Sequence, residues 1–385
     1  MTDKIRILIM TAPYGNGHFS VSNSIIEELK KYDDVEYIVY DIYSEDYPVT
    51  TKFVNKFYMS TYKKGLSQQA YRFFYYGSDK ILNLKVAKPY VNFGLKKMLK
   101  KVKEVEPDLI LNTFPVTCTY LLKEYGFNVP VYTVITDYFA NSNWISSEIR
   151  LHFLATENVS NQLISRGIVK NQYRVTGIPI KPIYYEEYDD KEINKLKEKY
   201  QIENNKKVVL LVAGAHGVVP NISKIVSYIT DEDNLELMVV CGKNKHLYKK
   251  LKRKFSKHKN LRIYEFVYNL HELMRISDLM ITKPGGITMT ESANIGIPVV
   301  LYRPVYGQEL ENAIYFNSMR AATIALQEDE LIYKTLTILN DDELLNEMKI
   351  NIKKIAIKNS ANLITNYLIE DYKKYIEEKN ENHKN

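Results

Sequence analysis

Residues 279–291 read Leu279-Met280-Ile281-Thr282-Lys283-Pro284-Gly285-Gly286-Ile287-Thr288-Met289-Thr290-Glu291, and this stretch decides the fold class. An apolar run, a glycine-containing turn and a helical pattern follow one another, which is typical of the strand–turn–helix unit of α/β proteins. Backbone N–H groups of Gly286, Ile287 and Thr288 would open the helix, where unpaired amides and the helix dipole favour a phosphate. Glu291 falls one turn later, and its carboxylate suits the two hydroxyls of a ribose. We therefore expect a nucleotide diphosphate at this turn.

A second loop-to-helix junction follows at Gly307-Gln308-Glu309. Gln308 and Glu309 place an amide beside a carboxylate, a combination that suits a polyhydroxylated sugar. The helix dipole favours any acid in a first turn, and this effect alone would explain Glu291. It does not explain why Thr288, Gln308 and Glu309 occur together with it. The stretch therefore predicts a nucleotide-sugar site.

Apolar runs alternate with helical patterns on both sides of this stretch, which predicts parallel sheets covered by helices. The 385 residues are enough for two domains. We expect an acceptor domain over 1–180 with an insertion at 47–104, a linker over 181–205, a donor domain over 206–376 and a polar, frayed tail over 377–385. Strands are predicted at 5–11, 35–40, 109–112, 131–135, 150–155, 207–212, 236–241, 261–265, 279–282 and 299–301.

The first predicted strand runs into the loop Tyr14-Gly15-Asn16-Gly17-His18. This loop lacks the three spaced glycines of a dinucleotide site and the lysine of a P-loop. His18 falls in the first turn of a helix, where the dipole disfavours imidazolium, so its neutral ring suits a general base. Asp137, after the strand at 131–135, could hold the tautomer of that ring. The alternatives are a tight turn with an incidental His18, and a helix cap or Asx turn at Asp137.

Composition excludes several classes of protein. A chain that is 45% hydrophobic and 26% charged is an ordinary globular one. No run approaches the roughly 18 apolar residues of a spanning helix. Two cysteines, Cys118 and Cys241, cannot build a disulfide framework or a structural zinc site. No metal and no cofactor are expected, and the chain is predicted to be cytoplasmic.

The segment 52–103 is strongly basic and aromatic. It contains thirteen Lys or Arg residues, one acid (Asp79) and eleven aromatic residues. This combination indicates an anionic surface, either phospholipid or nucleic acid. A solvated face of ordinary helices is the alternative.

Several motifs together resemble the inverting GT-B glycosyltransferases of the monogalactosyldiacylglycerol synthase and processive diacylglycerol β-glucosyltransferase family. The resemblance runs nearly end to end, and the group around Gly286 is its most specific part. The matching motifs are Tyr14-Gly15-Asn16-Gly17-His18, Thr136-Asp137-Tyr138 with Trp144, Thr176-Gly177-Ile178-Pro179-Ile180, Gly214-Ala215-His216-Gly217, Glu265-Phe266-Val267, Thr282-Lys283-Pro284-Gly285-Gly286-Ile287-Thr288, and Gly307-Gln308-Glu309 with Asn312.

The resemblance implies two Rossmann-like domains facing across a cleft, with the acceptor on the N-terminal domain and the donor on the C-terminal one. By similarity, Phe266 and Val267 lie along uracil, Thr288 contacts phosphate, Glu291 binds ribose, and Gln308 with Glu309 binds the hexose. Further donor-site residues implied are Gly15, Gly17, Gly214, His216, Gly286 and Ile287. His18 matches the position of the family's proposed base, and the basic segment matches its membrane-facing part, which favours a membrane over nucleic acid.

Two departures from the family pattern bear on the site. The plant galactosyltransferases carry an Asp before the first glycine loop, where this chain has Thr11-Ala12-Pro13. A catalytic role of that Asp would therefore fall to Asp137 in this chain. Lipid-modifying members often place a His between the Thr-Asp pair and the Trp, where this chain has Ala140-Asn141-Ser142-Asn143.

The resemblance and the residues together predict a UDP-sugar-dependent transferase that moves a hexose, glucose before galactose, to diacylglycerol or a glycosyl-diacylglycerol as a β-glycoside. A polyprenyl-linked or soluble acceptor is the alternative within the fold, and a nucleic-acid-binding protein is the alternative in another class. The protein would lie on the inner face of the cell membrane, bound to anionic phospholipid, without a metal or nucleic acid. The expected acceptor and membrane contacts are Phe73, Phe74, Tyr75, Arg72, Lys63, Lys64 and Trp144.

Overall fold

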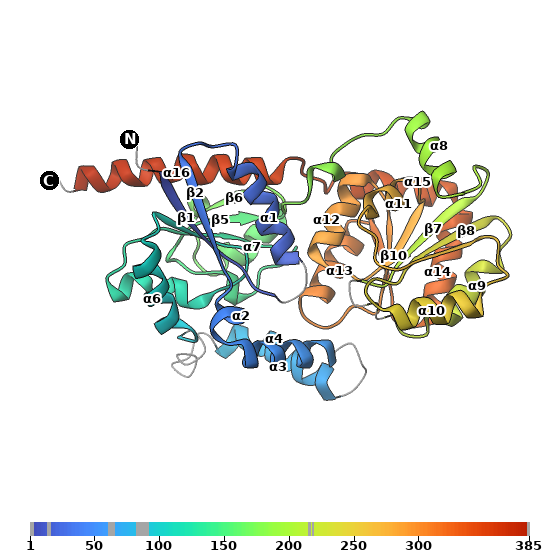
Figure 1. Cartoon of the computed structure of the whole chain (residues 1–385), viewed down its shortest axis with the longest axis horizontal. Helices are drawn as coiled ribbons and strands as arrows, with labels where there is room; N and C mark the ends of the chain where they lie inside the picture. The colour runs from blue at the N-terminus through green and yellow to red at the C-terminus, as the bar shows by residue number, and fades with distance from the viewer. Residues whose placement is uncertain are drawn as a thin grey trace. The chain divides into compact units, whose positions relative to one another are not determined.

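The computed structural model describes residues 4–13, 17–60, 66–81, 92–214, 217 and 219–382. The chain divides into two compact units (Figure 1). The first unit comprises Met1–Lys181 and Ile357–Asn385, and the second comprises Pro182–Ala356. This division differs from the predicted end of the second domain at residue 376, because the chain returns to the first unit at Ile357.

The first unit is built on a six-stranded parallel sheet of order β2-β1-β3-β4-β5-β6. Its central strands are buried on both faces, as a parallel sheet between helices requires, and Ile7, Leu8 and Ile9 of β1 have no exposed surface. The strands are β1 (Ile5–Met10), β2 (Val35–Tyr40), β3 (Leu109–Asn112), β4 (Val131–Val134), β5 (Ile149–Leu154) and β6 (Tyr173–Val175).

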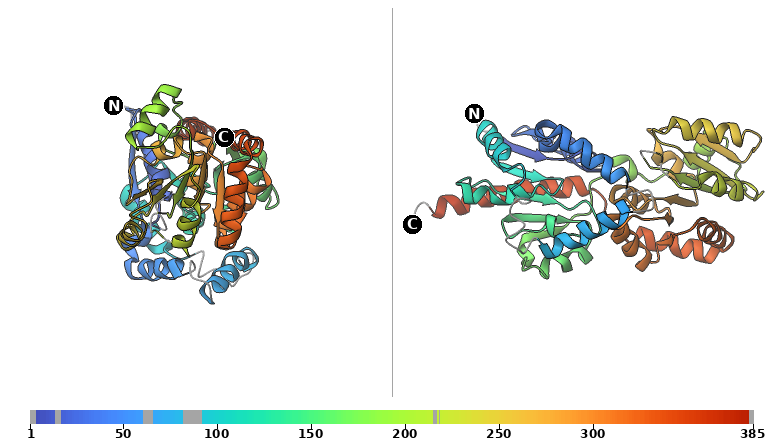
Figure 2. Two further views of the ribbon diagram at one scale, coloured as in Figure 1. Left: turned by 90° about the vertical axis from the view of Figure 1, so that its right-hand side faces the viewer. Right: turned by 90° about the horizontal axis from the view of Figure 1, so that it is seen from below.

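The helices of the first unit include a pair, α3 and α4, that follows β2 at the carboxyl end of the sheet (Figures 1 and 2). The helices and short 3-10 turns are α1 (Gly17–Leu29), α2 (Ile42–Asp46), α3 (Pro48–Ser60), α4 (Leu66–Ile81), α6 (Leu95–Val105), η2 (Thr117–Tyr125), η3 (Ser142–Trp144), α7 (Glu157–Ile164), η4 (Lys170–Gln172) and α16 (Ser360–Asn382).

The second unit repeats the plan, with a parallel sheet of order β12-β11-β10-β7-β8-β9. Strands β7 and β8 are almost wholly apolar and pair in register from Lys207 with Leu235 to Val212 with Val240. The strands are β7 (Lys207–Val212), β8 (Leu235–Val240), β9 (Leu261–Tyr264), β10 (Leu279–Thr282), β11 (Val299–Tyr302) and β12 (Ala322–Ala325). The helices are η5 (Pro182–Tyr184), α8 (Asp190–Lys199), α9 (Ile222–Thr230), α10 (Lys245–Lys254), α11 (Leu270–Arg275), α12 (Gly286–Ile295), α13 (Gln308–Ser318), α14 (Glu328–Asn340) and α15 (Asp342–Lys353).

Each sheet has a point at which the strand order reverses. In the first sheet, β1 lies between β2 and β3, and in the second, β7 lies between β8 and β10. The loops after β1 and β3 therefore diverge in the first unit, as do those after β7 and β10 in the second. In open α/β sheets, ligands bind in the crevice at this switch point. Two of the loops predicted to carry chemistry, those after β1 and β10, begin there.

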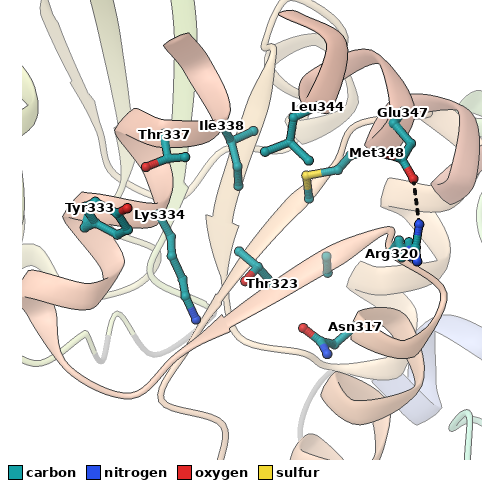
Figure 3. A pocket seen from close by; sticks show the side chains of 11 residues that line it. Asn317, Arg320, Thr323, Tyr333, Lys334, Thr337, Ile338, Leu344, Glu347 and Met348 are labelled. Atoms are coloured by element: carbon teal, nitrogen blue, oxygen red, sulfur yellow. Dashed lines mark hydrogen bonds and ion pairs between the residues drawn. The ribbon is translucent and has the colours of Figure 1, made fainter. Parts of the chain in front are cut away.

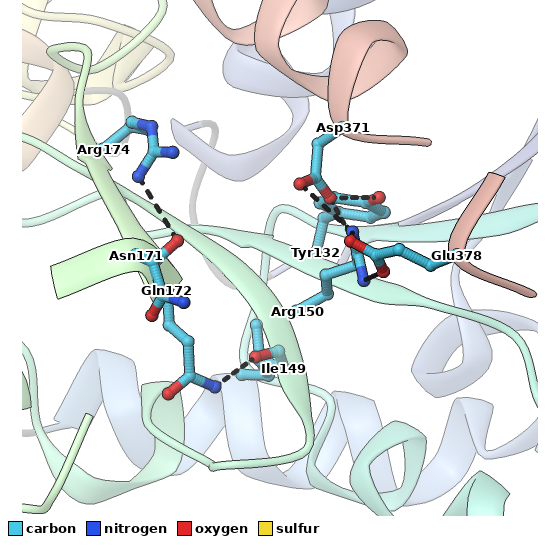
Figure 4. Close-up of polar contacts among 8 residues, drawn as sticks. All are labelled: Tyr132, Ile149, Arg150, Asn171, Gln172, Arg174, Asp371 and Glu378. Atoms are coloured by element: carbon cyan, nitrogen blue, oxygen red, sulfur yellow. Dashed lines mark hydrogen bonds and ion pairs between the residues drawn. The ribbon is translucent and has the colours of Figure 1, made fainter. Parts of the chain in front are cut away.

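The last helix fastens the end of the chain to the first unit (Figure 4). Asp371 of α16 accepts hydrogen bonds from the Arg150 guanidinium and from the Tyr132 hydroxyl, the latter at 2.8 Å. Glu378 accepts from Arg150 at 3.0 Å. Helix α16 also packs along α1. The prediction of a frayed tail from Glu377 is therefore wrong as far as Asn382, because Glu378 has a fixed partner.

Ten strands were predicted and all ten are present within a residue or two, whereas β6 and β12 were not predicted. Both are edge strands of three or four residues. In the described ranges, no helix combines the length and apolar content that a membrane crossing requires.

Candidate active site

His18 lies in the first turn of α1, at the switch point of the first sheet. Its Nδ1 is 2.9 Å from the carbonyl oxygen of Thr113, which follows β3, and 3.3 Å from the Thr136 hydroxyl, which follows β4. A carbonyl can only accept, so Nδ1 carries the proton and Nε2 presents a lone pair. The loops after β3 and β4 thus fix one tautomer of the ring.

Thr113 is itself held in place by hydrogen bonds. Its hydroxyl donates to the Met10 carbonyl at 3.0 Å and lies 2.7 Å from the Ser22 hydroxyl, while Ser22 also reaches the His18 carbonyl. Met10 ends β1 and Ser22 lies on α1, so the imidazole is tied to two rigid elements. Such support reduces the motion of the imidazole.

Burial lowers the pKa of His18 to about 4, and the Thr113 carbonyl opposes this shift only in part. The ring of Phe114 packs edge-on at 4.9 Å, and that of Trp144 lies 6.3 Å away. The imidazole is therefore neutral at pH 7, as a proton acceptor must be.

Asp137 directly follows Thr136 and is half-buried. The predicted role of Asp137 in holding the tautomer of His18 is wrong, because the Nδ1 proton faces the main-chain carbonyl of Thr113. Thr113 carries this role through its backbone, and a backbone group has no side-chain signal in the sequence. Trp144 is buried beside His18, on η3.

The turn before α12 occupies the switch point of the second sheet. Helical bonding begins with the Met289 N–H donating to the Gly285 carbonyl at 3.0 Å, so the amides of Gly286, Ile287 and Thr288 form the open first turn. Buried Asn312 donates to the Pro284 carbonyl at 3.0 Å and fixes the turn from α13. The geometry is that of an anion site at a helix N-terminus.

Glu291 lies on α12 one turn from this opening and is half-buried. The hydroxyl of buried Tyr184, from η5, is hydrogen-bonded to its carboxylate. The pKa of the Tyr184 hydroxyl is raised by burial first and by the negative charge of Glu291 second. Tyr184 was not predicted from the sequence, because 107 positions separate it from its partner.

Glu309 is 7% exposed and accepts the Val305 N–H at 3.0 Å, so its carboxylate also shapes the loop before α13. Lys283 lies close by: burial lowers the pKa of its ammonium to about 8, and Glu309 opposes that shift. Lys283 was not predicted as a site residue, although a cation between a strand end and a glycine turn is a recognisable phosphate signal. Gln308 begins α13.

The expected base-binding residues follow β9. The Phe266 ring is 41% exposed, contacts Tyr268 at 5.2 Å between centroids and has the Lys243 ammonium 6.0 Å away, while Val267 is half-buried. Gly214, after β7, has a φ of 73° and open space where a Cβ would be. Gly17 begins α1. Gly15 and His216 lie outside the described residues.

Four of the expected membrane contacts, Arg72, Phe73, Phe74 and Tyr75, lie on α4. Phe73 is 76% exposed and Arg72 is exposed, but Tyr75 is only 8% exposed and its ring contacts Tyr71 and Tyr76. The prediction of Tyr75 as an inserting residue is therefore wrong: it lies one helical turn from Tyr71 and packs inward with it. Phe53 of α3, at 71%, is a second exposed ring. Lys63, Lys64 and the side chain of Phe74 lie outside the described residues.

A pocket of about 430 Å³ lies elsewhere in the second unit (Figure 3). Arg320 on its rim pairs with Glu347, and Lys334 pairs with Glu330 and the Ile324 carbonyl. Both cations of the pocket therefore already have partners within the protein. None of the predicted site residues lines this pocket. Its lining is Asn317, Arg320, Ala322, Thr323, Tyr333, Lys334, Thr337, Ile338, Leu344, Glu347 and Met348.

Solved structures share this fold over nearly the whole chain. S. aureus MnaA in a co-structure with UDP has a TM-score of 0.64 at 15% identity, covering 94% of this chain and 96% of that one. MurG of Acinetobacter baumannii has a TM-score of 0.63 at 14% identity, covering 95% and 99%. With the two parallel sheets, this establishes the GT-B fold of two Rossmann-like units.

Sequence comparisons agree with the fold. Residues 18–180 match the family model of monogalactosyldiacylglycerol (MGDG) synthase, and residues 208–364 match that of the glycosyltransferase family 28 C-terminal domain. The processive diacylglycerol beta-glucosyltransferase of Bacillus cytotoxicus is 38% identical over 95% of this chain and 94% of its own. That of Bacillus licheniformis is 37% identical over 96% of each. The chain therefore belongs to the processive diacylglycerol beta-glucosyltransferase family of GT-B glycosyltransferases.

Proposed function

We propose that the protein transfers a hexose, glucose in preference to galactose, from a UDP-sugar to diacylglycerol or a glycosyl-diacylglycerol. The chain is 37–38% identical to processive diacylglycerol beta-glucosyltransferases over almost its whole length, which supports both the acceptor class and the sugar. The observation that carries the chemistry is the neutral His18 imidazole, whose tautomer presents Nε2 as a proton acceptor.

In the reaction, Nε2 of His18 takes the proton from the acceptor hydroxyl while the hydroxyl oxygen bonds to the anomeric carbon. The bond from that carbon to the UDP oxygen breaks on the opposite face, so an α-linked donor yields a β-glycoside. The open amides of Gly286, Ile287 and Thr288 take the charge that develops on the leaving diphosphate. The nearby Lys283 ammonium adds a positive charge.

The remaining groups would bind and orient the donor. Glu291 accepts the ribose hydroxyls, Phe266 and Val267 lie along uracil, and Gln308 with Glu309 contacts the hexose. Gly214 lets the backbone approach the donor at the second switch point. Asp137 and Trp144 would line the acceptor side next to His18, and Asp137 acts there on the acceptor rather than on the imidazole.

We further propose that α3 and α4 dock on anionic phospholipid at the inner face of the cell membrane. Phe53 and Phe73 would enter the lipid while Arg72 and neighbouring lysines face the headgroups. Each buried aromatic ring contributes about 1.5–3 kcal/mol and each cation about 1 kcal/mol. Helix α4 contacts η3, which carries Trp144 beside His18. A lipid held at α4 would therefore have its hydroxyl near the base.

A transfer assay tests this function. The protein is incubated with UDP-glucose or UDP-galactose and with vesicles that contain diacylglycerol, and lipids are identified by mass spectrometry. We expect mono- and diglucosyl-diacylglycerol, with less product from UDP-galactose. Transfer only to a polyprenyl phosphate or a soluble acceptor would overturn the proposed acceptor. Binding of RNA or DNA with no effect of UDP on the melting temperature would overturn the enzyme assignment.

A further inference from the structure

A tyrosine outside the predicted donor loops contacts the carboxylate that we place at the ribose. Tyr184 is 6% exposed and lies at the end of η5, which packs on α12. Its hydroxyl is hydrogen-bonded to Glu291. No sequence motif of the donor site includes it, and the transfer chemistry above does not use it.

The surroundings of Tyr184 keep its ring in one place. Helix α11 also packs on α12, and from it the His271 ring meets the Tyr184 ring edge-on at 6.0 Å between centroids. The guanidinium of Arg275, also on α11, donates to the Ile183 carbonyl at 2.8 Å and lies 4.1 Å from the Tyr188 ring. Arg275 therefore fixes the turn that carries the tyrosine.

We propose that Tyr184 is a positioning residue for the donor: its hydroxyl orients the Glu291 carboxylate toward the two ribose hydroxyls of the UDP-sugar. This inference rests on the proposed function. A carboxylate has about four acceptor positions, so one bond from Tyr184 leaves capacity for a ribose. A carboxylate fixed before the ligand arrives loses less side-chain freedom on binding. The raised pKa of Tyr184 keeps its hydroxyl protonated and donating.

The proposal makes the effect of Tyr184 depend on the ribose hydroxyls. Calorimetry measures the affinity of wild type and Tyr184→Phe for UDP and for 2′,3′-dideoxy-UDP. We expect wild type to prefer UDP by about tenfold or more, the effect of hydrogen bonds to a charged group. Tyr184→Phe should lose about fivefold to tenfold in affinity for UDP, on the same scale, and nothing for the dideoxy compound.

A matched control removes a similar hydroxyl elsewhere in the same unit. The Tyr200 hydroxyl donates to Glu272 at 2.5 Å, so Tyr200→Phe should leave both affinities at the wild-type value. The double variant Tyr184→Phe/Glu291→Gln checks the route. It should bind UDP no more weakly than Glu291→Gln alone, because Tyr184 acts only through Glu291.

The outcomes separate this inference from the proposed function. A wild-type protein that binds both nucleotides equally, or neither, would contradict the ribose site itself. A wild-type protein that prefers UDP, with a Tyr184→Phe variant that either matches it or weakens equally for both nucleotides, would overturn the positioning role alone. Additive losses in the double variant would also overturn it.

Discussion

At the scale of single residues, the site depends on hydrogen bonds that hold reactive side chains in one state. Thr113 gives His18 its tautomer through a carbonyl oxygen, and burial keeps the ring neutral. Asn312 shapes the turn at Pro284 from a different helix. The sequence pointed to His18 and Glu291 through their residue types and positions. It could not find Thr113, whose backbone acts, or Tyr184, whose partner is distant in the chain.

Replacing the base should slow the chemical step and leave donor binding intact. His18→Ala removes the proton acceptor, so kcat should fall by about 10²- to 10⁴-fold, the usual contribution of general-base catalysis. UDP affinity, measured by calorimetry, should stay within about twofold of wild type, since Glu291, Phe266 and the amides that open α12 lie in the other unit. The exposed His246 serves as a control, and His246→Ala should retain wild-type kcat. Full turnover by His18→Ala would assign the proton to another group.

The pH dependence of kcat reports the protonation of the same ring. Burial lowers the pKa of His18 from 6.5 to about 4, so the neutral, active form persists as the pH falls and is lost only near pH 4. We therefore expect a flat kcat between about pH 5.5 and 8, and a decline below about pH 5. A half-maximal rate near pH 6.5 would show an unperturbed histidine and contradict this environment.

At the scale of elements, the sequence predicts buried strands well because their apolar runs are continuous. The two missed strands, β6 and β12, are short edge strands without such runs. Phe73, Phe74 and Tyr75 were predicted to insert together, but consecutive residues of a helix point to different faces. Tyr75 packs inward with Tyr71, while Phe73 points to solvent. The spacing of apolar residues predicted the helices, but it did not show whether each helix face contacts protein, solvent or lipid.

Helices α3 and α4 should bind anionic vesicles through their exposed rings. Phe53→Ser/Phe73→Ser should reduce sedimentation with anionic vesicles by at least about tenfold, because each ring contributes about 1.5–3 kcal/mol on insertion. Binding should weaken with salt and be lost on neutral vesicles. Tyr333, at 71% exposure on α14, gives the control Tyr333→Ser, which should sediment like wild type. Equal sedimentation of the double variant would place the docking surface elsewhere.

At the scale of the whole molecule, the chain visits the first unit twice, and α16 completes it. The sequence predicted two units of the correct type but assigned residues 357–376 to the wrong one. An amphipathic pattern marks a helix without naming the unit that covers its apolar face. The hydrogen bonds of Asp371 and Glu378 with Arg150 attach α16 to the first unit. They join positions more than 200 residues apart, so local sequence patterns could not predict them.

Loss of Arg150 should weaken the attachment of α16. Arg150→Ala leaves partly buried Asp371 without its charged partner, so we expect a loss of about 1–3 kcal/mol in the stability of the first unit. Hydrogen exchange of α16 should rise more than that of α12, which lies in the second unit. The exposed pair of Arg320 and Glu347 gives the control Arg320→Ala, with an expected loss of at most about 1 kcal/mol. Unchanged exchange in α16 would show that its apolar face alone holds it.

The configuration of the product tests the central claim most directly. Wild-type protein is incubated with UDP-α-glucose and diacylglycerol vesicles, and the glycolipid is examined by proton NMR for the coupling constant of its anomeric proton. A base at His18 and a diphosphate held at the opening of α12 predict a single displacement, and hence a β-glycoside. An α-glycoside, or hydrolysis of UDP-glucose without any glycolipid, would contradict the account.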